Sequence, residues 1–113
     1  MYTAESLGRI LPCLQDSLKA MFGAHLKELI LFGSCARGEA DPGSDVDLLI
    51  LVDLPREETI RYRRPIAAIA GEVLLSENVL ISPILENQSF FEEHSAVLPF
   101  YQNILREGVR LSA

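Results

Sequence analysis

Apolar side chains near the start of the chain recur every three or four residues, which is the spacing of one face of an α-helix. They are Leu7, Ile10, Leu11, Leu14, Leu18, Met21 and Phe22. Gly23 is a natural end for this helix, because glycine readily adopts the backbone conformation that closes one. Pro12 lies inside the pattern, and its ring clashes with the carbonyl four residues back, at Gly8. We therefore expect a kink or a second helix start near Pro12.

Three apolar runs predict the strands of a β-sheet. Residues 29–32 and 46–52 are almost unbroken apolar runs, as expected of buried strands. Residues 34–44, which lie between them, are rich in residues that favour turns. Residues 79–85 form the third run, and Pro83 within it favours an edge strand or a bulge because proline has no amide hydrogen.

Helical spacing returns over residues 60–74 and 97–107. Pro65 is expected to bend or break the first of these helices, and Gly108 to end the second. The predicted order is helix, strand, strand, helix, strand, helix. This order predicts an α/β (α+β) fold, with a small mixed β-sheet flanked by helices. The length of 113 residues predicts one domain over residues 1–113.

The composition indicates a folded protein of the cytoplasm. Hydrophobic residues make up 49% of the chain and charged residues 23%, which supports a modest core and argues against a disordered chain. Cys13 and Cys35 form neither a disulfide framework nor a zinc spacing, and free thiols fit a reducing compartment. The sequence has no signal peptide and no apolar run long enough to cross a membrane.

The net charge of −6 argues against a protein that binds the phosphate backbone of nucleic acid over a broad surface. A nucleotide or another protein is the favoured partner. The basic side chains in the middle of the chain form either a solvated helix face or a patch for an acidic partner. They are Arg56, Arg61, Arg63 and Arg64. Tyr62 among them is a candidate for stacking on a base, whereas the aromatic residues near the C-terminus are expected in the core. These are Phe90, Phe91, Phe100 and Tyr101.

The candidate chemistry lies at the start of the second strand. Asp45 and Asp47 are two residues apart, so in a strand their side chains point to the same face. Two carboxylates held together repel each other, and a shared Mg²⁺ removes that cost. Mg²⁺ prefers oxygen ligands and takes one or two carboxylates together with substrate phosphates. The pair therefore predicts a site for Mg²⁺, or Mn²⁺.

A candidate phosphate-binding segment follows the first strand. Gly33 lets the backbone approach a ligand closely, and the Ser34 hydroxyl and the amides after Gly33 can donate to phosphate oxygens. Arg37 is a candidate to contact a phosphate or to pair with a carboxylate. Taken singly, each of these residues is more often an ordinary turn or surface residue. The order of strand, Gly-Ser, Arg-Gly, polar loop and acidic pair is much rarer.

Gly33-Ser34, ten intervening residues and then Asp45-Val46-Asp47 resemble the signature of the DNA polymerase β-like nucleotidyltransferases. Arg37-Gly38 and Ser44-Asp45-x-Asp47-Leu48 resemble the motif of the minimal nucleotidyltransferase group within that superfamily. The resemblance implies a triphosphate held by Gly33, Ser34, Arg37 and Ser44. It also implies that Asp45 and Asp47 bind Mg²⁺ and act in catalysis, with ATP or another nucleoside triphosphate as substrate.

The resemblance also implies a partner. Minimal nucleotidyltransferases often pair with a small helical HEPN protein in toxin–antitoxin systems, where the transferase can place AMP on the toxin. We therefore expect transfer of AMP from ATP to a HEPN-type protein. A homo-oligomer is also possible. Transfer to a small molecule, as in aminoglycoside-modifying relatives, is a further alternative.

The family usually has a third carboxylate on a neighbouring strand, and this sequence departs from that pattern. Leu80 or Ser82 occupies the matching position, and Glu77 and Glu86 only flank the strand. The alternative function is therefore a weak or inactive nucleotide-binding module that regulates a partner by direct contact.

Overall fold

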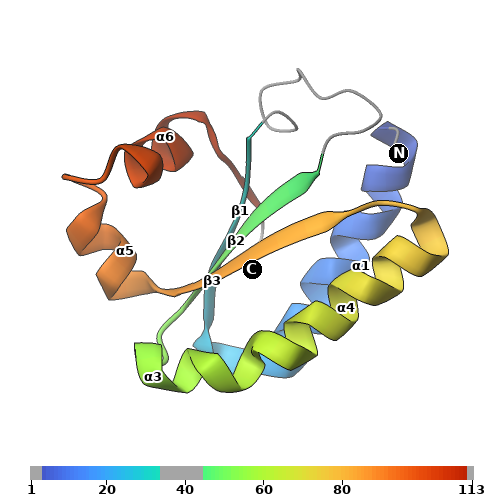
Figure 1. Ribbon diagram of the computed structural model, residues 1–113, viewed down its shortest axis with the longest axis horizontal. Helices are drawn as coiled ribbons and strands as arrows, with labels where there is room; N and C mark the ends of the chain where they lie inside the picture. The colour runs from blue at the N-terminus through green and yellow to red at the C-terminus, as the bar shows by residue number, and fades with distance from the viewer. Residues whose placement is uncertain (1–3, 34–44, 112–113) are drawn as a thin grey trace.

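The computed structural model describes residues 4–33 and 45–111, and side chains from residue 7 onward. A central β-sheet lies between two layers of helices (Figure 1). The helices are α1 (Ala4–Phe22), α3 (Arg56–Thr59), α4 (Arg63–Glu77), α5 (Gln88–His94) and α6 (Pro99–Glu107), with short 3₁₀ turns η1 (Gly23–His25) and η2 (Ile60–Tyr62). The strands are β1 (Leu26–Phe32), β2 (Val46–Val52), β3 (Ile81–Asn87) and β4 (Val109–Leu111).

The strands form one four-stranded mixed sheet in the order β3-β2-β1-β4. β1 pairs antiparallel with both β2 and β4, whereas β2 and β3 are parallel. The predicted α/β (α+β) fold with a small mixed sheet is therefore confirmed. The prediction that Pro83 marks an edge strand is also confirmed, because β3 lies at one edge of the sheet.

β2 is apolar throughout because both of its faces are covered. Side chains at even positions, such as Leu48 and Ile50, pack toward α1 and α4. Leu49 and Leu51 belong to a second core cluster, with residues of α5 and α6. Side chains alternate along a strand, so Asp47 shares the face of Leu49. Asp47 therefore faces the α5 and α6 layer.

α1 runs unbroken through Pro12, so the expected second helix start is wrong. Pro12 lies on the exposed side of the helix, away from the buried stripe that packs on the sheet. The buried stripe of α1 holds the helix against the sheet. It consists of Ile10, Leu14, Leu18 and Phe22.

The expectation that Pro65 breaks the middle helix is confirmed, but the break lies just before Pro65. The predicted helix over residues 60–74 is interrupted at η2, just before Pro65, and α4 then begins at Arg63. Pro65 is thus in the first turn of α4, where amide hydrogens have no partner within the helix. Tyr62 is half-buried and packs on Phe22 of α1 with ring centroids 4.6 Å apart. Its stacking on a base stays a prediction.

Two elements were not predicted. α5 follows β3 directly, and the Asn87 side chain caps it by accepting a hydrogen bond from the Phe90 amide at 2.9 Å. β4 follows α6 and pairs with β1, with Val109 opposite Leu31. Within the described part of the chain, no helix is both long and apolar enough to cross a membrane.

Candidate active site

The end of β1 and the start of β2 bring two predicted site residues together. Phe32 is the register partner of Asp47 in the antiparallel pair, and Gly33 directly follows Phe32. The glycine of the candidate phosphate-binding segment therefore lies beside one carboxylate of the acidic pair. This neighbourhood follows from strand pairing, so it rests on the rigid part of the fold.

Gly33 is required by its geometry. Its φ is +78°, a conformation that side chains other than glycine rarely adopt. A Cβ at this position would overlap Oδ2 of Asp47 and come within 3.3 Å of its Cγ. The Asp47 carboxylate thus occupies the space that any side chain at residue 33 would need.

Asp45 and Asp47 stand on either side of a fully buried residue, Val46. The Val46 amide donates a 2.9 Å hydrogen bond to the Leu80 carbonyl, which fixes the start of β2. Both aspartates are half-buried. They are thus anchored by a buried strand yet reachable by a ligand.

The acidic pair fits Mg²⁺ or Mn²⁺ by its donor chemistry. Carboxylate oxygens are ligands that Mg²⁺ accepts, and it commonly takes only one or two of them alongside substrate phosphates. Among the residues that the structure describes, no group of three or more histidine, cysteine or acidic side chains could hold a metal. Asp45 and Asp47 would therefore supply part of a coordination shell that a triphosphate completes.

Ser82 stands where a third carboxylate would be expected. It is the register partner of Asp47 in the parallel β2–β3 pair, and it is half-buried. Leu80 precedes β3, so of the two candidates Ser82 is the one beside Asp47. A hydroxyl can donate or accept a hydrogen bond, but it carries no negative charge for Mg²⁺ and is a much weaker base than a carboxylate.

Glu77 and Glu86 do not supply the missing acid. Glu77, at the end of α4, pairs with Arg9 of α1 at 3.0 Å. Glu86 lies opposite Leu51, four residues along β3 from Ser82, which is roughly 13 Å. Both carboxylates are engaged elsewhere in the fold.

Glu86 has a structural role at the opposite end of the sheet. It is only 8% exposed, and it accepts hydrogen bonds from Arg56 Nε at 3.1 Å, the Asn87 amide at 2.9 Å and the Tyr101 hydroxyl at 3.3 Å. Arg56 also stacks over Phe90, 3.7 Å from the ring centroid. Burial and the neighbouring Glu86 charge raise the pKa of Tyr101.

A cavity of about 280 Å³ opens beside Gly33 and Asp47. Its other wall is formed by α6, through Phe100, Asn103, Ile104 and Glu107. The prediction that Phe100 belongs to the core is wrong, because this side chain is 51% exposed at the cavity. Phe91 is buried as predicted. In the sequence, the helical spacing of residues 100, 103 and 107 is the signal that could have indicated this wall.

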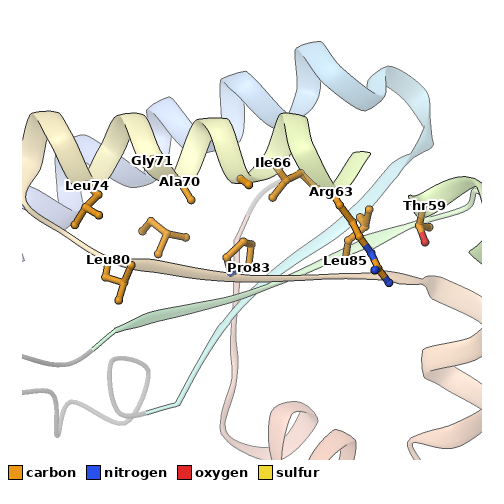
Figure 2. A pocket seen from close by; sticks show the side chains of 11 residues that line it. Thr59, Arg63, Ile66, Ala70, Gly71, Leu74, Leu80, Pro83 and Leu85 are labelled. Atoms are coloured by element: carbon orange, nitrogen blue, oxygen red, sulfur yellow. The ribbon is translucent and has the colours of Figure 1, made fainter. Parts of the chain in front are cut away.

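A larger cavity lies on the other face of the sheet. It has a volume of about 570 Å³ and runs between α4 and the edge strand β3. Figure 2 shows Ile66, Ala70 and Leu74 of α4 facing Leu80, Pro83 and Leu85 across this groove. Arg63 and Thr59 lie at one end of it (Figure 2).

Asp53 directly follows β2 and belongs to a different cluster of charged side chains. His25 Nδ1 lies 2.6 Å from its Oδ1, and Lys27 Nζ 3.4 Å from its Oδ2. The hydrogen bond from His25 and the charge of Lys27 lower the pKa of Asp53. Asp53 is six residues from Asp47, roughly 20 Å along a strand, and so lies outside the site.

Several predicted site residues lie outside the described part of the chain. They are Ser34, Arg37 and Ser44, together with Cys35. Their assignment to phosphate binding therefore stays a prediction. Gly33, Asp45 and Asp47 are the predicted residues that the structure describes.

Comparison with known proteins identifies one protein family and three named relatives. The sequence profile of the nucleotidyltransferase domain matches residues 12–108. Three relatives come from Methanocaldococcus jannaschii, each with the provisional name of protein adenylyltransferase. One is 32% identical over 93 residues, which is 82% of this chain and 85% of the relative. A second is 44% identical over 60% of this chain and 71% of its own length. A third is 40% identical over 70% of this chain and 54% of its own length.

Proposed function

Since this chain belongs to the nucleotidyltransferase domain family, and is thus a nucleotidyltransferase, we propose that it transfers AMP from ATP to a hydroxyl group of a partner protein. The observation that carries the proposal is the contact between Gly33 and Asp47. It joins the candidate phosphate-binding segment to the acidic pair at one end of the sheet. The names of the three relatives support AMP as the group and a protein as the acceptor.

In the proposed reaction the acceptor hydroxyl oxygen attacks the α-phosphorus of ATP. A new oxygen–phosphorus bond forms while the bond from that phosphorus to the bridging oxygen breaks. Pyrophosphate leaves with the electron pair, and the hydroxyl proton passes to water. Such transfers depend mainly on positioning of the reactants and neutralisation of charge.

Different residues of this chain would bind the metal and the triphosphate. Asp45 and Asp47 would hold Mg²⁺ or Mn²⁺, which supplies positive charge to the phosphates when bound. Gly33, with Ser34, Arg37 and Ser44 proposed beside it, would hold the triphosphate. The buried β2 strand would keep the two carboxylates in place.

The acceptor that we propose is a HEPN-type protein, as the resemblance to minimal nucleotidyltransferases implies. Such a pair would act as a toxin and its antitoxin, with the transferred AMP blocking the toxin. We propose a cytoplasmic location for the pair, because ATP is abundant there and Cys13 is an exposed free thiol.

The test is transfer of label from α-labelled ATP to a purified HEPN-type protein of the same organism, with Mg²⁺ present. Asp47→Asn should lower the transfer rate at least about a hundredfold, because it removes a group that stabilises the charge of the reacting phosphates. Asp53→Asn is the matched control, since it removes the same charge from a cluster outside the site. Unchanged transfer by Asp47→Asn would contradict the proposed roles.

A second candidate function is a binding module that neutralises its partner without turnover. Ser82 in place of a third acid favours it, because the hydroxyl lies beside Asp47 and cannot act as a carboxylate base. The groove between α4 and β3 also favours it, since Leu74 and Leu80 are exposed there and Arg63 provides a positive end. Such a groove suits a partner with an apolar ridge and an acidic residue.

The same experiment separates the two functions. The binding module is favoured if the HEPN-type protein is bound and inhibited without becoming labelled. It is also favoured if Asp47→Asn binds and inhibits the partner as well as the wild-type protein does. Inhibition that requires both ATP and Asp47 favours the transferase.

A further inference from the structure

Four residues of α6 line the cavity that contains Gly33 and Asp47, and all but the buried Ile104 are aromatic or polar. Phe100, Asn103 and Glu107 are spaced three and four residues apart, so they lie on one face of the helix. The helix is fixed close to the site at both of its ends. Its last turn leads through Gly108 into β4, which pairs with β1 next to Phe32.

Gly108 holds this end of α6 against the sheet. A Cβ at residue 108 would overlap the Ile104 carbonyl and the Ile30 side chain. The absence of a side chain therefore lets the helix end pack directly on β1. Glu107, which immediately precedes Gly108, is consequently fixed beside the end of β1.

Phe100 provides an aromatic surface at the other end of the cavity. Its ring meets Phe32 edge-on, with centroids 5.8 Å apart and an angle of 81° between the ring planes. Tyr101 lies 6.1 Å away on the same helix. Phe100 nevertheless remains 51% exposed, so it is oriented by its neighbours and still accessible. An oriented, accessible ring of this kind suits stacking on a planar base.

The charges at the cavity indicate which part of a nucleotide it accepts. Glu107 lines the α6 wall of the cavity, and its carboxylate disfavours phosphates at that wall rather than beside Gly33 and Asp47. Arg106 Nη2 lies 3.9 Å from Glu107 Oε1. An ionised glutamate only accepts hydrogen bonds, so Glu107 suits a group that donates them, such as a sugar hydroxyl. Asn103 carries an amide, with its oxygen accepting a 2.6 Å hydrogen bond from Arg106.

The volume and position of the cavity also favour a nucleoside. About 280 Å³ is close to the lower end of the range for small-molecule pockets, about 300 Å³. The cavity lies on the β1 and β4 side of Asp47, whereas Ser82 lies on the β3 side. A nucleoside in the cavity would thus leave the Ser82 side of Asp47 for the acceptor.

We propose that the Phe100, Asn103 and Glu107 face of α6 is the nucleoside subsite. The base stacks on Phe100 with its polar edge toward Asn103, and a ribose hydroxyl donates to Glu107. This inference rests on the proposed function, because it takes the phosphates to be at Gly33 and the metal at the acidic pair.

The test measures the affinity of the protein for MgATP and for magnesium tripolyphosphate, which lacks the nucleoside. Phe100→Ala should weaken MgATP binding about fivefold to a hundredfold, the effect expected of one lost base–aromatic stack. It should leave tripolyphosphate binding unchanged. Leu105→Ala is the matched control, since Leu105 is exposed on the same helix and does not line the cavity.

Glu107→Gln gives a second readout that a purely structural role would not produce. The wild-type protein should bind MgATP more tightly than the magnesium complex of 2′,3′-dideoxy-ATP, and Glu107→Gln should remove most of that difference. Thermal unfolding of each variant without ligand checks that it is folded.

The outcomes distinguish this inference from the proposed function. If MgATP binds in a manner that requires Asp47 but Phe100→Ala and Glu107→Gln leave its affinity unchanged, the subsite is wrong and the function stands. If the wild-type protein binds neither MgATP nor tripolyphosphate, both are overturned. If Phe100→Ala weakens both ligands equally, the ring supports the fold and the subsite is wrong.

Discussion

At the scale of single residues, Gly33 shows how backbone geometry determines the site. Its positive φ turns the chain at the end of β1, and its missing side chain leaves space for Asp47. The sequence indicated that a glycine allows a ligand to approach. The structure adds that a carboxylate of the protein itself already uses that space.

We expect Gly33→Ala to lower both stability and nucleotide affinity. The backbone strain of a left-handed alanine costs about 1–3 kcal/mol, and the new methyl group also displaces the Asp47 carboxylate. Denaturant unfolding and MgATP titration measure the two effects. Gly71→Ala is the control, because Gly71 is in helix α4 with nothing within 4 Å of an added Cβ.

Gly71→Ala should stabilise the protein by about 0.5–1 kcal/mol, the usual gain for alanine over glycine in a helix. If Gly33→Ala unfolds at the same denaturant concentration as the wild type and keeps its affinity for MgATP, the close contact with Asp47 affects neither stability nor nucleotide binding.

At the scale of elements, the sequence predicted best where a segment is long and regular. The stripe of α1 and the apolar run of β2 were both found, because many residues repeat one signal. β4 was missed because it has three residues, of which Val109 and Arg110 are exposed. α5 was missed because seven residues with only Phe91 buried give little periodic signal.

The same reasoning explains what was missed at the site. Gly33, Asp45 and Asp47 are close in sequence and belong to one motif, so they could be predicted together. The wall contributed by α6 comes from more than fifty residues away. Its position depends on the pairing of β4 with β1, which no local pattern predicts.

α6 is tied to the sheet by the hydrogen bond from Tyr101 to Glu86, and this contact should make stability depend on alkaline pH. The pKa of Tyr101 is raised in the folded protein above its ordinary value of 10.0. The unfolded chain therefore releases this proton at lower pH than the folded one. The contribution is complete below pH 10 and is lost as the pH rises through the folded pKa.

We thus expect the free energy of unfolding to fall as the pH rises through and above 10.0, and Tyr101→Phe to reduce that fall. Urea unfolding at several pH values measures it. Other tyrosines and lysines also titrate in this range, so only the difference between the two proteins is informative. Equal slopes for the two proteins would show that the raised pKa of Tyr101 has no effect on stability.

At the scale of the whole molecule, the two faces of the sheet divide the work. Asp47 and the α6 wall are on one face, and the groove between α4 and β3 is on the other. A partner held in the groove would leave the cavity beside Asp47 open. The net charge of −6 fits protein and nucleotide ligands better than long nucleic acid.

Ligand binding at this site should stabilise the whole protein, because the site joins β1, β2 and α6. MgATP at a hundred times its dissociation constant should add about 2.7 kcal/mol to the free energy of unfolding. For a small domain this is a rise in Tm of several degrees or more. Thermal unfolding with Mg²⁺ alone, with MgATP and with ATP plus a chelator measures it.

The rise should require Mg²⁺ and should disappear in Asp47→Asn. Asp53→Asn should retain it, since its cluster lies at the other end of β2. A rise of the same size in Asp47→Asn, or with ATP and chelator, would place the nucleotide somewhere other than the acidic pair.

The pairing of β4 with β1 also has a consequence for synthesis on the ribosome. β4 is the last of the described elements to emerge, yet its partner β1 is among the first. The acidic pair and Gly33 can therefore be assembled by a nascent chain in which α6 is still unanchored. Contacts between segments so distant in sequence also tend to form late in folding. The growing polypeptide would thus complete the proposed phosphate-binding end before the proposed nucleoside subsite on α6.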